Sequence, residues 1–215
     1  MDYTTEISVD GNATFVSVPD TVRLLIRLSA KAQNYSCAVE KINAGARDVN
    51  AALVSCGVVN LPQTREYAVE EDWVNKYDDE KRRLVGYEGV QQLVVDFPID
   101  MEKIGKVLQA LGNIDIHPSV DAYFEVKDQT EMLKHARREA LDAATATAHN
   151  MATQMGLKIV GLKTVQHAMS GRGSRHSLHV AYESDLLVKS SLSIPEIVPE
   201  EVSNTANVSV TWFAV

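Results

Sequence analysis

A run of alternating residues, broken once by a proline, constrains the fold of this chain more than any other feature. The segment ATFVSVPDTVRLLIRLSA (13–30) has two strand-like halves joined by Pro19-Asp20. Alternation of apolar and polar residues indicates a strand with one buried face. Proline cannot donate to a β-ladder and belongs at an edge, a bulge or a strand start. We therefore expect a turn or kink at Pro19-Asp20, so that 14–18 and 22–30 pair with different strands.

The rest of the chain alternates between helix and strand patterns. Apolar residues at helical spacing predict two long helices, from Asn34 to Gly57 and from Asp128 to Gly156, and a short one from Asp100 to Gly112. Strand patterns cover 64–73, 83–97, 120–126, 159–165 and 202–215, with a short piece at 178–182. Asp10-Gly11 is a hairpin-turn signal between 6–9 and 14–18. These elements predict an α+β fold, with largely antiparallel sheet layers packed by two long helices and one short helix.

The longest helix is rich in alanine. Its predicted apolar line is Leu133, Ala136, Ala140, Ala143, Thr147, Met151 and Met155. Alanine side chains make a helix narrow, so we expect this helix to lie close on a sheet.

Charge, hydropathy and cysteine content limit the partners and the compartment. The formal net charge is −8 and the pI about 5.2, which argues against a nucleic-acid surface. No segment approaches the roughly 18–20 apolar residues of a membrane span, and MDYTTEISVDG lacks the features of a signal peptide. Cys37 and Cys56 lie on one predicted helix, about 28 Å apart, and cannot bridge each other. Two unpaired thiols favour the cytoplasm, with the periplasm or cell envelope as the alternative if a signal peptide has been removed.

The sequence contains no recognised catalytic, nucleotide-binding or metal-binding motif. We therefore predict no catalytic residue, cofactor or metal ligand. His176 and His179 have an HxxH spacing, but on a strand they would point to opposite faces. With Arg172 and Arg175 they form a positive patch in the Ser-, Gly- and Pro-rich segment 169–199. This patch is a candidate site for an anion or an acidic partner, and the alternative interpretation is an exposed, solvated loop.

Several pieces of the chain, in their order and spacing, resemble the SIMPL-domain family. The pieces are ISVDGNATFVSVPDTVRLLIRL, AALVSCGV with LPQT, VGYEGVQQLVVDF, KIGKVLQAL, HARREALDAATATAHNMATQMGLKIV and VPEEVSNTANVSVTWF. Pro19-Asp20 is the hallmark of the first piece, and Gly86 and Tyr87 lie in the third. The resemblance implies a bacterial structural or binding module of unknown specific role, without catalytic residues. It also implies links to stress tolerance and to the cell envelope, and some members assemble into large rings.

Together these observations predict a single SIMPL-like domain over 1–215, or two subdomains at about 1–98 with 200–215 and about 99–199. The expected function is non-enzymatic, through self-association and contacts with an unknown protein partner. The alternative is a small-molecule or anion-binding protein, or an undetected enzyme, that uses a pocket under the 169–199 segment.

Overall fold

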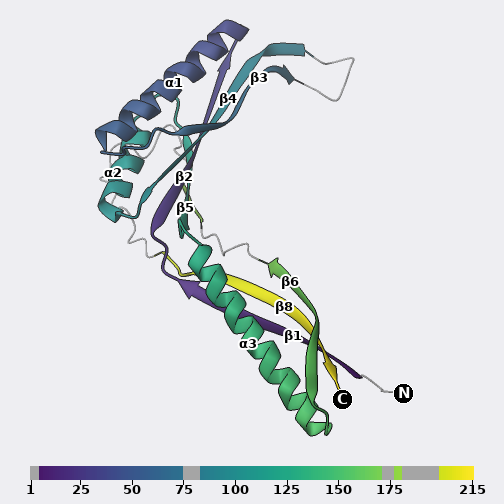
Figure 1. Cartoon of the computed structure of the whole chain (residues 1–215). Coiled ribbons are helices and arrows are strands. Elements are labelled where there is room, and N and C mark those ends of the chain that lie inside the picture. The colour runs from purple at the N-terminus through teal and green to yellow at the C-terminus, as the bar shows by residue number, and fades with distance from the viewer. Residues whose placement is uncertain (1–4, 75–82, 171–176, 181–198) are drawn as a thin grey trace. The chain divides into compact units, whose positions relative to one another are not determined.

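The computed structural model describes residues 5–74, 83–170, 177–180 and 199–215, and it confirms the predicted α+β class. The described residues form two antiparallel sheets and three helices, which are divided between two compact units (Figure 1). Within the described residues the chain passes from one unit to the other at Pro19-Asp20, at Phe124-Glu125 and at Pro199-Glu200. The short helix after residue 98 packs in the same core as the strands before it. The organisation as one domain over 1–215, or as two subdomains, stays a prediction.

The first unit is a three-stranded sheet with one helix on it. Its strands are β1 (Thr5–Ser17), β8 (Val202–Ala214) and β6 (Ile159–Ser170), in the order β1-β8-β6. Both outer strands run antiparallel to the central β8. Helix α3 (Thr130–Gln154) lies along one face of this sheet, over β1 and β8 (Figure 1).

Helix α3 touches the sheet through a stripe of small residues. The buried positions repeat every four residues: Met132, Ala136, Ala140, Ala144, Ala148 and Ala152. The predicted apolar line was right at Ala136 and Ala140 and wrong toward the C-terminus, where Met151 and Met155 are exposed. Alanine occurs on every side of this helix, so composition could not distinguish the buried side.

Strand β1 is continuous, and the predicted hairpin at Asp10-Gly11 is wrong. Gly11 faces α3, where a Cβ atom would lie 2.1 Å from the carbonyl oxygen of Ala140 and 2.8 Å from the Cβ of Ala144. The glycine therefore serves a close approach of helix to strand, not a turn.

The second unit is a five-stranded sheet covered by two helices. The strands β2 (Thr21–Ala32), β3 (Gln63–Val74), β4 (Arg83–Pro98), β5 (Ser119–Glu125) and β7 (Ser177–Val180) take the order β3-β4-β2-β5-β7. Helices α1 (Tyr35–Ser55) and α2 (Met101–Gly112) lie on one side of it (Figure 1). The largest fully buried side chains here come from β2, both helices and β5: Leu24, Ile26, Leu28, Ile42, Leu53, Ile104, Leu111, Val22, Val49, Val107 and Val120.

The ends of the helices follow the predicted signals in most respects. Asp100 accepts a hydrogen bond from the Lys103 amide at the start of α2, and Gly57 adopts the left-handed conformation after α1. Asn34 occupies the N-cap of α1 without a side-chain hydrogen bond. At the start of α3, the carboxylate of Asp128 accepts a hydrogen bond from the backbone amide of Thr130.

The predicted change of partner at Pro19-Asp20 is confirmed. The strand before it, β1, pairs with β8, and the strand after it, β2, pairs with β4. Asp20 holds the start of β2 in place: its backbone oxygen accepts from the Ile99 amide at 3.0 Å, and its carboxylate accepts from the Thr21 hydroxyl at 2.7 Å.

Candidate functional site

Most of the predicted positive patch lies outside the described residues. This holds for Arg172, Arg175 and His176, and for the side chain of His179. The backbone of His179 lies on β7, opposite Asp121 of β5. Whether these four residues form one site stays a prediction.

The family positions Gly86 and Tyr87 have structural contacts in the second unit. A Cβ atom at Gly86 would lie 2.4 Å from the carbonyl oxygen of Ala32, so the glycine lets β4 approach the end of β2. The ring of Tyr87 packs edge-on against Tyr35, with ring centroids 5.8 Å apart. Both residues therefore contribute to packing around the end of β2 and the start of α1.

Neither a metal-binding cluster nor a disulfide occurs among the described residues. Among the residues that the structure describes, no three His, Cys, Asp or Glu side chains gather closely enough to hold a metal ion. Cys37 is exposed, Cys56 is half-buried, and both are free thiols, as the spacing predicted. None of the helices in the described ranges is long and apolar enough to cross a membrane.

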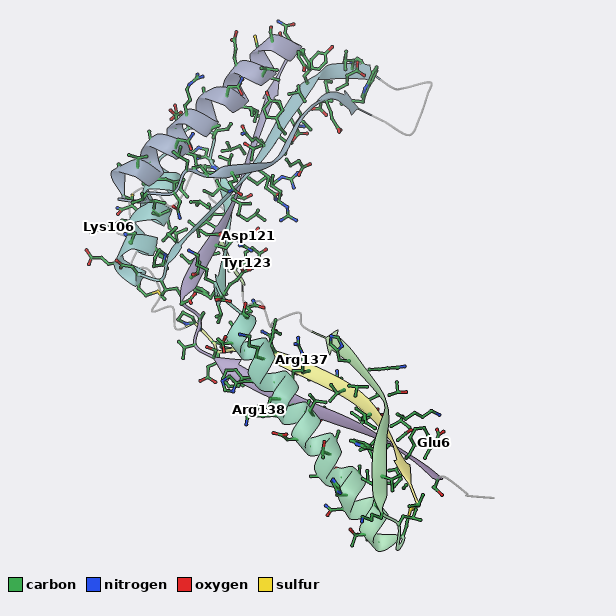
Figure 2. All side chains as sticks on the ribbon, in the orientation of Figure 1. Glu6, Lys106, Asp121, Tyr123, Arg137 and Arg138 are labelled. Carbon is green, nitrogen blue, oxygen red and sulfur yellow. The ribbon has the colours of Figure 1, made fainter. Side chains whose placement is uncertain are left out.

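The face of the three-stranded sheet away from α3 is polar and regular. Hydroxyl pairs link β1 to β8 at Ser8–Thr211 and Thr14–Thr205, each at 2.8 Å. Glu6, near the start of β1 (Figure 2), pairs with Lys163 of β6, whose ammonium lies 5.7 Å from the centre of the Phe213 ring. The ion pair thus spans the width of the sheet.

Both edges of this sheet are long. Within the described residues β1 and β6 are its outermost strands, 13 and 12 residues in length. Because α3 lies over β1 and β8, apolar side chains on the helix side of β6 stay open: Leu162 is 57% exposed and Val165 47%. An uncovered edge with open apolar side chains is a natural place for another chain to pair.

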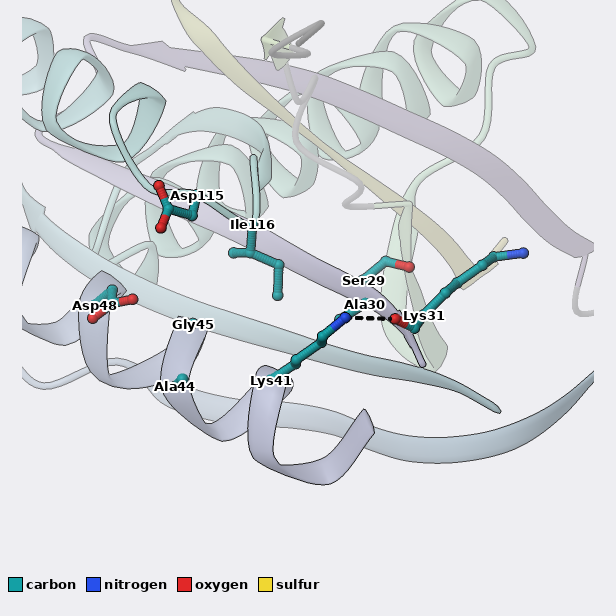
Figure 3. Close-up of a pocket in the computed structure, with 9 residues that line it drawn as sticks. All are labelled: Ser29, Ala30, Lys31, Lys41, Ala44, Gly45, Asp48, Asp115 and Ile116. Atoms are coloured by element: carbon teal, nitrogen blue, oxygen red, sulfur yellow. Dashed lines mark hydrogen bonds between the residues drawn. The ribbon is translucent and has the colours of Figure 1, made fainter. Parts of the chain in front are cut away.

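A pocket of about 450 Å³ lies in the second unit, between β2 and α1 (Figure 3). Its lining comes from the end of β2, one side of α1 and the turn after α2: Ser29, Ala30, Lys31, Lys41, Ala44, Gly45, Asp48, Asp115 and Ile116. Gly45 makes room for Ile116, whose side-chain carbons would lie 3.0 Å from a Cβ atom there. The Lys41 ammonium donates to the backbone oxygen of Lys31 at 3.0 Å.

The two lysines of the pocket differ in role. The side chain of Lys31 points away from Lys41 and donates to Asp72 at 2.8 Å (Figure 3). That hydrogen bond and the charge of Asp72 raise the pKa of Lys31 above its ordinary value. Lys41 is therefore the cation that faces the pocket.

Sequence patterns did not reveal this pocket. Lys41 and Asp48 are seven positions apart on the polar side of an amphipathic helix, which is the usual pattern of a solvated surface. Asp115 joins them only through the packing of the turn after α2. The spacing of Lys41 and Asp48, two helical turns, was the one local signal that they share a face.

Comparison with known proteins identifies the family and nothing narrower. No curated protein matches the chain. The family model described as SIMPL, protein of unknown function (DUF541), matches residues 7–212, which is nearly the whole chain. The match includes most of both units and the boundaries between them. The chain therefore belongs to the SIMPL (DUF541) family, whose function is unknown.

Proposed function

We propose that this chain is a non-enzymatic SIMPL protein that acts by self-association and by contacts with other proteins. The observation that carries the proposal is the pair of long edges on the β1-β8-β6 sheet. Edge strands present unpaired backbone groups, and addition of a strand from another chain is a common mode of recognition. A stress-related role and a cytoplasmic location, with the periplasm as the alternative, belong to the same proposal and rest on the family resemblance and the free thiols.

The charges of the two edges favour one way of pairing. Strand β1 carries Glu6 and Asp10 and no basic residue, whereas β6 carries Lys163 and His167 and no acidic residue. Contact between β1 of one copy and β6 of the next joins opposite charges, and contact between like edges joins like charges. Because both strands run antiparallel to β8, the unlike edges pair in parallel when the copies have the same orientation.

Pairing of unlike edges has a consequence for the assembly. The contact uses two different surfaces, so each copy keeps one free edge and can add a further copy. Open apolar side chains at Leu162 and Val165 add surface to bury at each junction. Further copies then add until the rotation between neighbouring copies closes the assembly into a ring.

Light scattering coupled to size-exclusion chromatography tests this proposal on the full chain. We expect the mass to rise with protein concentration, and to fall when about 0.5 M salt screens the charges. The Val165→Glu variant puts a negative charge on the β6 edge, opposite the acidic β1 edge of the next copy, and should shift the protein toward the monomer. The matched control, Val54→Glu, changes an exposed valine on α1 (59% exposed, against 47% for Val165) and should leave the mass unchanged. A strict monomer over a wide concentration range, or equal effects of both variants, would refute the proposal.

A further inference from the structure

The pocket between β2 and α1 has opposite charges at its two ends. Asp48 and Asp115 lie at one end and Lys41 at the other (Figure 3). Among the described residues, neither carboxylate takes part in a hydrogen bond or an ion pair. The one described polar contact of the Lys41 side chain is the backbone oxygen of Lys31. The charged groups are thus available to a ligand with a cationic and an anionic end.

Helix geometry sets the length of such a ligand. Lys41 and Asp48 are seven residues apart on α1, and at 1.5 Å per residue their backbones are separated by about 10 Å. Three residues of an extended peptide span about 10 Å. A tripeptide with free termini matches this backbone separation better than a free amino acid does.

The opposite wall of the pocket suits an extended backbone. Strand β2 forms this wall with Ser29, Ala30 and Lys31, and it lies between β4 and β5 in the sheet. The backbone oxygen of Lys31 accepts a hydrogen bond from the Lys41 side chain. A peptide that displaces the Lys41 ammonium from this oxygen can donate one backbone N–H to it.

We propose that this pocket binds a short, extended peptide with free termini. The N-terminal ammonium lies between the carboxylates of Asp48 and Asp115, and the C-terminal carboxylate accepts from Lys41. The peptide backbone follows β2 in the same direction, because α1 returns along β2 from Lys41 to Asp48. The site lies in the second unit and does not rest on the proposed self-association.

Three probes separate the contributions of the two termini. The ¹⁵N-labelled full chain is titrated with trialanine, N-acetyl-trialanine and trialanine amide, and amide chemical shifts are followed. We expect trialanine to shift the amides of Ser29 to Lys31, of Ala44 and Gly45, and of Ile116. Each blocked peptide should bind about fivefold or more weakly, since it lacks one ion pair at a half-open site.

Isosteric variants connect each terminus with its partner. Asp48→Asn should weaken the binding of trialanine but leave the binding of N-acetyl-trialanine unchanged, because the acetylated peptide has no ammonium to interact with Asp48. Lys41→Gln should weaken the binding of trialanine but leave the binding of trialanine amide unchanged. The control Asp142→Asn removes an exposed carboxylate from α3, in the other unit, and should change no affinity. All three positions are exposed, so the folded spectrum should persist. Equal binding of the three peptides, or no shifts at these amides at millimolar trialanine, would overturn the proposal.

Discussion

Replacement of Gly11 by alanine is the sharpest test of how the first unit is packed. The added Cβ atom would lie 2.1 Å from the carbonyl oxygen of Ala140, and also 2.9 Å from the backbone nitrogen of Ala144. Ordinary van der Waals contact begins at about 3.4 Å, so α3 must move away from β1 by about 1.3 Å, which is 3.4 minus 2.1. Backbone atoms of α3 cannot move independently of the helix, whereas the end of a flexible side chain can change its conformation.

The cost follows from what that movement separates. A gap of 0.5–1 Å already removes about a quarter to a half of the dispersion attraction between the separated atoms. The alanine stripe of α3 offers no long side chain that could refill the gap. We expect Gly11→Ala to lower the free energy of unfolding of the first unit by about 3 kcal/mol, the upper end of the range for overpacked sites.

Urea unfolding followed by tryptophan fluorescence measures this loss. Trp212 is buried under α3 and reports on the first unit, so the measurement is made in a Trp73→Phe background that removes the tryptophan of the second unit. Gly161→Ala on β6 is the matched control, because a Cβ atom there meets nothing within 4 Å. We expect it to change stability by less than about 0.5 kcal/mol.

A third variant separates this explanation from a hairpin turn at Asp10-Gly11. Asparagine is well tolerated at the left-handed positions of such turns. Gly11→Asn should nevertheless be at least as destabilising as Gly11→Ala, because its side chain meets the same helix backbone. Wild-type stability of either variant would show that α3 does not lie on β1 as described.

Three further changes have expected outcomes. Pro19→Ala should destabilise by about 0.5–1 kcal/mol in urea unfolding, because alanine frees the unfolded chain while the partner change at this position persists. The hydrogen bonds from Thr130 hold the pKa of the Asp128 carboxyl below its ordinary value. The stability that the ionised carboxyl gives to the start of α3 is therefore present above the ordinary pKa, and it is lost as the pH falls through the lowered pKa. A carboxyl NMR titration of the wild type and of Thr130→Val should show the pKa of Asp128 move upward in the variant. Gly86→Ala should destabilise the second unit by about 2 kcal/mol in thermal unfolding, since its Cβ atom meets the backbone oxygen of Ala32 at 2.4 Å.

Local signals predicted the fold where one element's own residues decide its structure. The alternation of β2, the stop at Gly57 and the cap at Asp100 depend on neighbours in the chain. Pro19 was informative because it excludes a continuous ladder whatever the partner strands are. The fold class followed from these elements, since long antiparallel strands and amphipathic helices permit few arrangements.

Sequence reasoning failed where a distant element decides the local structure. Asp10-Gly11 has the composition of a turn, but its conformation is set by a helix that begins some 120 residues later. The pocket is a second example, because Asp115 meets Lys41 and Asp48 only after α2 has packed beside α1. Neither juxtaposition has a periodicity that a local pattern could show.

The alanine stripe of α3 explains why the first unit keeps an open edge. The buried residues of α3 lie four positions apart, in a row inclined to the helix axis. Their small side chains bring the helix backbone near the sheet, as the close approach at Gly11 requires. Such a helix covers a narrow strip, here β1 and β8, and its width cannot extend over a third strand. Close packing on two strands and exposure of the third are therefore consequences of the same choice of residues, and that exposure is what the proposed self-association uses.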